Sequence, residues 1–469
     1  MTPSLPRRRT ERRGLRLWPV GTALTLTFAT AIAVAAAAFF AGWDLLGAQG
    51  LKPERQLTSS TLFDLVKLSF GVVAGAGALV ALVVAYRRQR VDEDGALRDA
   101  TRLHTERFTT AVSQLGEESA AVRLGGVHAL AGLANDAPTR DLRQTCIDVL
   151  CAYLRLPYTA EADLPLGDTV ARHEYLALRE VRHTVIRLIR DHLRLTPDNP
   201  HSWQGHDLDF TGVVFDGGDF SGAVFSGGTV NFSGAVFSSG TVTFTSAWFS
   251  GGTVTFNNAG FSGGTVRFDG AFSGGTVTFD GAGFSGGMVT FDRTGFSGGT
   301  VRFDGAEFSG GTVRFDLARF SGGTVTFDRT EFSSGTVAFN NAGFSGGTVT
   351  FDRTGFTGGT VRFDYAGFSG GTVRFDLARF SGGMVTFNNA RFSDGTVRFD
   401  GAEFSSGTVC FDYARFSGGM VTFDYAGFTG GTVDFSMADG VAPSGLVPSG
   451  GQPLPTGLSL PQAWYQPTP

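Results

Sequence analysis

Seven histidines are the side chains of this chain best suited to acid–base or metal chemistry, because histidine titrates near neutrality and ligates metals. All of them lie outside the glycine-rich repeats of the C-terminal half. His173 and Glu174 are not followed by the second histidine that a zinc-protease helix needs. His128 and His192 fall on apolar helical stripes, where a hydrogen-bonded core histidine is commoner than a ligand. The spacing therefore predicts no catalytic and no metal-binding residue.

Cysteines and phosphate-binding loops add no further chemistry. Cys146 and Cys151 lie five residues apart on different faces of a predicted helix, and Cys410 lies inside a repeat. These three do not form a disulfide framework and fit a reducing compartment. No glycine-rich loop ends in Lys-Ser or Lys-Thr, as a nucleotide-binding loop would. We therefore expect a protein that is not an enzyme and that binds no cofactor.

Charge and composition narrow the class of partner. The 469 residues carry a formal net charge of -5 and a pI of about 5.8, so no basic field extends along the whole chain. Direct nucleic-acid binding is not expected, and any DNA-like behaviour would be mimicry. The 68 glycines and 45 phenylalanines far exceed ordinary usage and indicate internal repetition.

Two apolar segments predict a membrane anchor at residues 17–90. The first runs from Leu17 to Ala41, long enough to cross about 30 Å of hydrocarbon as a helix, and the second from Leu68 to Tyr86. Arginines flank both: Arg7, Arg8, Arg9, Arg12 and Arg13 precede the first, and Arg87, Arg88 and Arg90 follow the second. The positive-inside rule then places residues 1–16 and everything after residue 90 in the cytoplasm, with Gly42 to Phe63 as a short external loop. The expected location is the cell membrane, as a multi-pass protein.

Two alternatives bear on this anchor. The first segment could be a cleaved signal peptide, but its apolar region exceeds the usual length of about 7 to 15 residues and a second span follows it. Gly71 and Gly75 form a GxxxG pair that would let two helices of a homodimer approach closely, although glycine is also simply tolerated in membrane spans.

Residues 91–203 have helical periodicity and predict a cytoplasmic bundle of three or four helices. Two buried stripes are expected, the first of Ile147, Leu150, Cys151 and Leu154, and the second of Leu178, Val181, Val185, Leu188 and His192. Pro138, Pro157 and Pro165 mark the breaks between helices. Four arginines most simply form a solvated helix face, with lipid-headgroup contact as an alternative: Arg179, Arg182, Arg187 and Arg190.

Phenylalanine recurs every five residues after Trp203, within LDFTG, VVFDG, GDFSG and AVFSG, at Phe210, Phe215, Phe220 and Phe225. A small or apolar residue lies two positions before each phenylalanine, and Thr, Asp or Ser follows it. This pattern resembles the pentapeptide-repeat family, and the two N-terminal spans resemble its membrane-anchored actinobacterial members. The resemblance covers residues 208–435 and implies an all-β, right-handed quadrilateral β-helix in which four pentapeptides form one coil. We therefore expect a β-solenoid over residues 204–436.

From Phe225 the unit becomes a dodecamer such as FSGGTVTFDRTG. Each dodecamer holds two pentapeptides plus an inserted Gly-Thr pair, so two dodecamers would form a coil of about 24 residues. A narrower solenoid with one dodecamer per turn is the alternative. Either coil stacks phenylalanine on phenylalanine at about 4.8 Å. The residue missing between Ala271 and Phe272 predicts a bulge or a tightened corner.

The outward positions carry the functional information. Aspartates form an acidic file because they follow the phenylalanines: Asp269, Asp280, Asp292, Asp304, Asp316, Asp328, Asp352, Asp364, Asp376, Asp400, Asp412 and Asp424. Asn340 and Asn388 share this position, which favours hydrogen bonds to corner backbone over a ligand site. Arginines in the middle of the TVRF segments form a basic column between these aspartates: Arg267, Arg302, Arg314, Arg362, Arg374 and Arg398.

Such mixed columns suit protein contacts. The sequence therefore predicts a membrane-tethered cytoplasmic scaffold that binds an unknown protein partner. The alternative is a DNA-mimic regulator of a topoisomerase or another DNA-binding protein. Residues 437–469 are rich in Pro, Gly and Ser and are expected to form a disordered tail.

Overall fold

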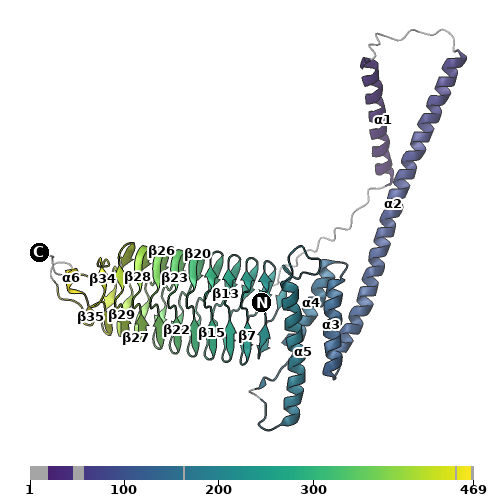
Figure 1. Ribbon diagram of the computed structural model, residues 1–469. Coiled ribbons are helices and arrows are strands. Elements are labelled where there is room, and N and C mark those ends of the chain that lie inside the picture. The colour runs from purple at the N-terminus through teal and green to yellow at the C-terminus, as the bar shows by residue number, and fades with distance from the viewer. Residues whose placement is uncertain (1–19, 46–57, 162–163, 449–451, 466–469) are drawn as a thin grey trace, which may run out of the picture. The chain divides into compact units, whose positions relative to one another are not determined.

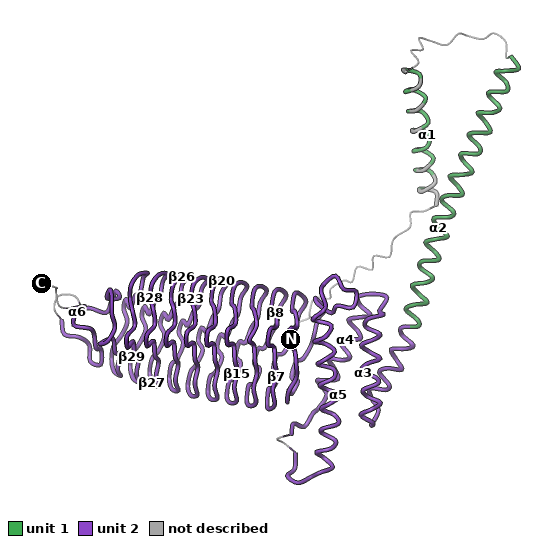
Figure 2. Tube along the Cα trace, in the orientation of Figure 1, with its two compact units in different colours: residues 1–103 green, residues 104–469 purple. Residues whose placement is uncertain are grey.

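The computed structural model describes residues 20–45, 58–161, 164–448 and 452–465. The chain divides into two compact units, residues 1–103 and 104–469, which Figure 2 shows in different colours. The helices are α1 (Val20–Leu45), α2 (Ser59–Leu115), α3 (Ala120–Asn135), α4 (Arg140–Arg155), α5 (Thr169–Leu193) and α6 (Gln462–Tyr465). The arginines predicted to flank the first span, Arg7 to Arg13, lie outside the described residues.

Among the described residues, α2 is the one helix long and apolar enough to cross a membrane, by length and composition. The corresponding apolar stretch of α1, residues 28–41, is shorter. The predicted multi-pass anchor is therefore not supported. The described residues contain one candidate membrane span, in α2. Within α2 the apolar stretch ends at Tyr86, and Arg87, Arg88 and Arg90 continue the same helix.

Helices α3, α4 and α5 form the predicted bundle. Thr139 caps α4 by accepting the N–H of Leu142, and Asp168 caps α5 by accepting those of Val170 and Ala171. The stripe of α4 is buried as predicted. In α5, Val181, Val185 and His192 are buried, whereas Leu178 and Leu188 are partly buried. The prediction for His128 was wrong, since this side chain lies on the exposed side of α3.

The repeats form two parallel β-sheets, seen as two rows of strands in Figure 1. Sheet A contains β1 (Leu208–Asp209), β4 (Val224–Phe225), β5 (Thr229–Asn231), β8 (Trp248–Phe249), β9 (Thr253–Thr255), β12 (Ala271–Phe272), β13 (Thr276–Thr278), β16 (Gly295–Phe296), β17 (Thr300–Arg302), β20 (Arg319–Thr326), β23 (Gly343–Thr350), β26 (Gly367–Arg374), β28 (Arg391–Arg398), β30 (Arg415–Phe416), β31 (Met420–Thr422) and β34 (Asp439–Gly440). Sheet B contains β2 (Val214–Phe215), β3 (Gly218–Asp219), β6 (Val236–Phe237), β7 (Thr241–Thr243), β10 (Gly260–Phe261), β11 (Thr265–Arg267), β14 (Gly283–Phe284), β15 (Met288–Thr290), β18 (Glu307–Phe308), β19 (Thr312–Arg314), β21 (Glu331–Phe332), β22 (Thr336–Ala338), β24 (Gly355–Phe356), β25 (Thr360–Arg362), β27 (Arg379–Thr386), β29 (Glu403–Cys410), β32 (Gly427–Phe428), β33 (Thr432–Asp434) and β35 (Leu458–Ser459).

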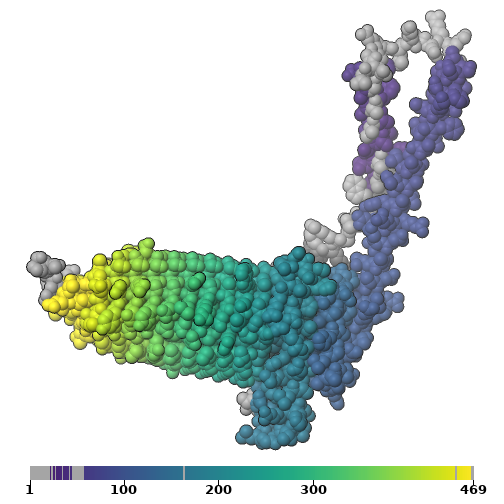
Figure 3. Space-filling model, in the orientation of Figure 1, coloured from purple at the N-terminus to yellow at the C-terminus, as the bar shows by residue number. Residues whose placement is uncertain are grey.

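The strand register settles the size of the coil. Arg319 of β20 pairs with Gly343 of β23, which is 24 residues further on, and Glu307 of β18 pairs with Glu331 of β21 at the same separation. Two dodecamers therefore form one coil, which confirms the wider solenoid and excludes one dodecamer per turn. The solenoid has about ten turns, and the colour bands of Figure 3 follow it from coil to coil.

The interior is filled by four columns of stacked phenylalanines. Phe315 is fully buried, and its ring centroid lies 4.6 Å from those of Phe291 and Phe339 in the coils before and after it. Phe315 also meets Phe303 and Phe327 edge to face near the middle of the coil, at 5.9 and 5.8 Å. Stacked and edge-on arrangements both suit aromatic quadrupoles, so the core combines apolar burial with favourable ring geometry.

Two kinds of corner close each coil. At the first kind, Ala318 donates its N–H to the carbonyl of Phe315 and Leu317 has a φ of +60°, as in a type II turn. At the second kind, Gly323 has a φ of +68°, and a Cβ there would lie 2.6 Å from the carbonyl oxygen of Gly299. Glycine at this position is therefore required both by backbone conformation and by the close stacking of coils.

The eleven-residue step shortens a corner of the first kind. Ala271 takes the strand position of Arg319 and donates its N–H to Ala247 as Arg319 does to Thr294, so the missing residue lies in the turn before it. Among the described residues no backbone N–H bonds the carbonyl of Phe268, whereas Ala318 bonds that of Phe315. Phe272 still stacks on Phe249 and Phe296, at 4.6 and 5.1 Å. The predicted tightened corner is thus present, and the phenylalanine column passes it without interruption.

The C-terminal segment corrects the prediction of a disordered tail from residue 437. Within the described part of this segment, β35 pairs with β33, joining Val433 to Leu458. Leu446, Leu458 and Leu460 are buried. Trp464 of α6 lies 5.6 Å from Phe416 and 5.8 Å from Phe435, ring centroid to ring centroid. A sequence rich in Pro and Gly here covers the last phenylalanines, because an uncapped solenoid would expose them.

Candidate interaction surface

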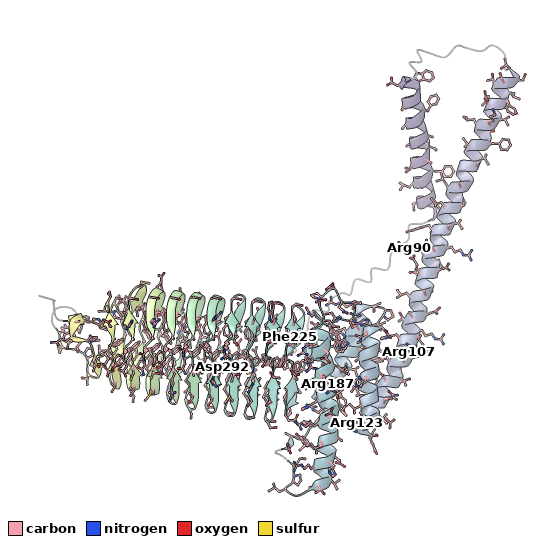
Figure 4. All side chains as sticks on the ribbon, in the orientation of Figure 1. Arg90, Arg107, Arg123, Arg187, Phe225 and Asp292 are labelled. Atoms are coloured by element: carbon pink, nitrogen blue, oxygen red, sulfur yellow. The ribbon has the colours of Figure 1, made fainter. Side chains whose placement is uncertain are left out.

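The acidic file forms a ladder of hydrogen bonds between coils, which we call the Asp ladder. Asp304 Oδ1 accepts the backbone N–H of Asp328 at 3.1 Å, and Asp328 Oδ1 accepts that of Asp352 at 3.0 Å. On the other corner column Asp292 accepts from Asp316 and Asn388 from Asp412, both at 3.1 Å (Asp292 is labelled in Figure 4). Asparagine replaces aspartate here because only an acceptor oxygen is needed. The predicted structural role of this file is confirmed.

Outward arginines pair with the second carboxylate oxygen of the ladder, and outward threonines share Oδ1 with the backbone N–H. Arg314 lies 2.8 Å from Asp292 and 3.0 Å from Asp316, and Arg302 pairs with Asp280. Thr326 and Thr350 donate their hydroxyls to Asp304 and Asp328, at 2.5 and 2.6 Å. Burial nevertheless raises the pKa values of Asp292, Asp304 and Asp376 above the usual range. The carboxylates are thus committed to the fold and offer little free charge to a ligand.

A different outward position, the residue before the phenylalanine, carries charges outside the Asp ladder. In sheet A the residue before the phenylalanine gives one column in successive coils, here called the sheet A column: Arg319, Gly343, Gly367, Arg391 and Arg415. The equivalent sheet B column is Glu307, Glu331, Gly355, Arg379 and Glu403. All the charged members are exposed. Within the described residues the three arginines of the sheet A column make no ion pair, whereas Glu403 lies 3.9 Å from Arg379.

A shallow hollow of about 480 Å³ lies beside the sheet A column. It is lined by Arg293, Leu317, Ala318, Arg319, Asn341 and Gly343. Leu317 is 46% exposed, and Tyr365 and Tyr413 project from the same corner column with exposures of 60% and 58%. Apolar side chains at a φ near +60° are strained, so this edge presents them to solvent at a conformational cost.

The bundle meets the first coil through a buried polar cluster around Asp216. Tyr158 and Tyr175 donate their hydroxyls to Asp216 Oδ2 at 2.5 and 2.6 Å, and His183 Nε2 lies 3.5 Å from Oδ1. Burial alone would raise the pKa of Asp216, but the contacts from His183, Tyr158 and Tyr175 outweigh it and hold this pKa well below its usual range. Burial and the bond to Asp216 raise the pKa of Tyr175 to about 12. The buried carboxylate of Asp216 thus joins the helical bundle to the first coil, and both of its oxygens have partners.

The predicted solvated arginine face of α5 was wrong for its inner members. Arg182 is buried, stacks 4.0 Å over the ring of Tyr158 and donates to the carbonyls of Leu154 and Val214, both at 2.7 Å. Arg190 pairs with Asp219. Arg187 remains exposed, as the prediction required. These arginines satisfy acceptors at the open edge of the first coil, which no further strand covers. Sequence periodicity could not predict these contacts, because arginines have the same spacing on a helix whether they face water or backbone carbonyl groups.

The remaining histidines and cysteines have structural surroundings. His192 bonds the carbonyl of Leu188 at 2.7 Å and stacks 4.1 Å from Trp203, and burial lowers its pKa. His104 lies 3.8 Å from the sulfur of Cys146, whose pKa burial raises to about 11. In the part of the chain that the structure describes, no group of three or more His, Cys, Asp or Glu residues is placed to hold a metal ion. The absence of enzymatic activity stays a prediction.

Gly71 and Gly75 line an apolar hollow between α1 and α2 of about 790 Å³, together with Ala31 and Ala35. A Cβ on either glycine would have nothing within 4 Å. The homodimer contact through this pair stays a prediction.

Comparison with known proteins gives no further assignment: no family model, no curated protein and no solved structure matches this chain.

Proposed function

We propose that this chain is a membrane-tethered protein-interaction scaffold, held by the apolar part of α2 and presenting the outward columns of the solenoid to a protein partner. The observation that carries the proposal is which positions of each coil are buried and which are exposed. The phenylalanine columns fill the interior and the Asp ladder occupies the corners, so recognition falls to the exposed positions that vary from coil to coil. A β-solenoid with such a surface suits binding to an extended partner.

The DNA-mimic alternative is less well supported. Mimicry of duplex DNA needs a continuous face of free negative charge, but the carboxylates of the ladder bond backbone N–H groups, threonines and arginines. The sheet A column is basic rather than acidic. The glutamates of the sheet B column are interrupted by Gly355 and Arg379, so neither of these two columns offers a topoisomerase a continuous run of free carboxylates.

The scaffold is tested by proximity labelling in the native cell, with the labelling enzyme fused at the C-terminus. The matched control is the same fusion to residues 1–103, which keeps the anchor and lacks the solenoid. We expect proteins labelled by the full chain and not by the anchor. Identical labelling by both would contradict a scaffold role.

The tether is tested with a reporter that is active only outside the cytoplasm. We expect activity after fusion at Gln56 and none after Gln89, since Arg87, Arg88 and Arg90 should stay inside. The opposite pattern would place the solenoid outside. A second tag at the N-terminus separates one span from two, because two spans return that end to the cytoplasm.

A further inference from the structure

The charges of the sheet A and sheet B columns complement each other along the solenoid. Glu307 stacks on Glu331 and Arg391 on Arg415 in adjacent coils, about one β-ladder spacing apart. Like charges so placed repel each other. Asp439 follows Arg415 in the sheet A column and offsets part of the repulsion there, whereas the column neighbours of Arg391 are Gly367 and Arg415. Counter-charge from outside would remove this repulsion.

The two columns cannot meet within one molecule, because they project outward from opposite sheets. Their order along the solenoid does match between two molecules that run antiparallel. Arg319 then opposes Glu403, Arg391 opposes Glu331, and Arg415 opposes Glu307. Gly343 opposes Arg379, and Gly367 opposes Gly355. Because every coil advances by the same ladder spacing, aligning one pair aligns all three.

The parallel arrangement without a shift along the solenoid is less favourable. It places Arg319 against Glu307 and Arg415 against Glu403, but it also places Arg391 against Arg379. A like-charge contact between desolvating faces costs more than an exposed ion pair contributes. A parallel arrangement shifted by one coil avoids the like-charge contact, but it opposes only Arg319 to Glu331 and Arg391 to Glu403, two ion pairs where the antiparallel arrangement gives three. Charge therefore favours the antiparallel arrangement.

We propose that solenoids of this protein associate side by side and antiparallel, with the sheet A column of one copy against the sheet B column of the next. The contact joins two different faces, so each copy keeps one free face of each kind. Repetition of the contact produces an open lateral row related by a two-fold screw, and not a closed dimer. The inference goes beyond the scaffold role and does not depend on the identity of its partner.

Glycines in both columns allow a test that leaves the charges intact. One further step along the antiparallel alignment brings Gly295 opposite Gly427, whereas the parallel alignment brings Gly295 opposite Gly283. A Cβ at any of the three has nothing within 4 Å, so cysteine fits each position. Full-length chains carrying Cys410→Ser with Gly295→Cys and Gly427→Cys, or with Gly295→Cys and Gly283→Cys, are treated in membranes with a short bis-maleimide.

We expect a ladder of covalent oligomers from the first pair, at least tenfold above the second, and its loss when salt shortens the screening length. Charge reversal by Arg391→Glu and Arg415→Glu should abolish it, as should Glu307→Arg with Glu331→Arg. All four changes together should restore it, because the complementarity returns with opposite sign. Circular dichroism of each variant checks that the solenoid is intact.

Three outcomes would overturn the proposal. The first is crosslinking of the Gly295/Gly283 pair alone, which would mean a parallel contact. The second is the absence of oligomers from intact chains. The third is sensitivity to the arginine reversals without sensitivity to the glutamate reversals, which would assign the sheet A column to an anionic membrane or another acidic partner.

Discussion

Asp304 accepts a hydrogen bond from the backbone N–H of Asp328, the residue that occupies its own position one coil later. The same bond recurs in most coils and links successive residues of a column, although Asn340 Oδ1 and Asp376 Oδ1 accept none. Such a column keeps its acceptors only while coils stay in register. The Asp ladder therefore fixes register at the corners, as the phenylalanines do in the core.

The ladder predicts that the solenoid becomes more stable on mild acidification. Burial raises the pKa values of Asp292, Asp304 and Asp376 in the folded state, so these groups bind protons more readily folded than unfolded. Their contribution to stability is full below the unfolded pKa of about 3.9 and is lost as pH rises through the folded values. The midpoint of denaturant unfolding, followed by hydrogen exchange in residues 280–400, should rise as pH falls from 7 toward 4. Asp304→Asn should flatten the dependence, and an unchanged slope would contradict the assignment.

Asp216 predicts the opposite pH response at the bundle end. Its pKa lies below the unfolded value, so it stabilises the fold above about pH 3.9 and the contribution is lost as pH falls further. Asp216→Ala should destabilise the junction by about 2–5 kcal/mol at neutral pH, because the buried hydroxyls of Tyr158 and Tyr175 lose their acceptor. Faster exchange in residues 208–225 would report it. Glu161→Gln, which removes an exposed pair with Arg172, is the matched control and should cost less than about 1 kcal/mol.

Phe315→Ala should leave a cavity and cost about 3–5 kcal/mol. The loss should appear as faster hydrogen exchange around Phe291, Phe303, Phe327 and Phe339, which contact the ring. Distant coils should change little, since each coil touches only its neighbours. Tyr365→Ala, at an exposed corner, serves as control. Equal effects from both substitutions would show that Phe315 is not an inward stacked residue.

Trp464→Ala tests the C-terminal cap. The indole covers Phe416 and Phe435 and donates its Nε1–H to the carbonyl of Gly440 at 2.9 Å. Its removal should raise hydrogen exchange and protease cleavage in residues 439–460, while residues near Phe315 stay protected. Tyr465→Ala, which removes a neighbouring exposed side chain, should have no such effect. If wild-type residues 439–460 already exchange at the rate of free chain, the segment is not a cap.

Much of the solenoid followed from the sequence because its determinants are local. A phenylalanine in every pentapeptide must be buried, and only a closed coil with stacked turns buries one from each side. The asparagines at positions 340 and 388 already favoured a structural role for this position, and Asn388 accepts the N–H of Asp412 as an aspartate would. Both features repeat along the chain, so each copy supports the same interpretation.

The ends of the solenoid depend on contacts between segments far apart in sequence. Asp216 follows a phenylalanine like any other aspartate of the file, and only the packing of α5 buries it between two tyrosines. Arg182 likewise has the sequence context of a surface residue, and only the packing of α5 on the open edge of the first coil buries it. The C-terminal segment has the composition of a disordered chain, yet Leu458 and Trp464 pack on the apolar end of the solenoid.

The charge columns show most directly what tertiary structure decides. Glu307, Arg319 and Glu331 are twelve residues apart in sequence, so one dodecamer per turn would stack them in a single column of alternating sign. With two dodecamers per coil, alternate units face opposite sides, and Arg319 is separated from Glu307 and Glu331. The sequence by itself determined which residues point outward, because the phenylalanine period sets inside and outside. Which outward residues become neighbours depended on the length of the coil, and that is set by how many phenylalanine columns the interior needs to close around a filled core.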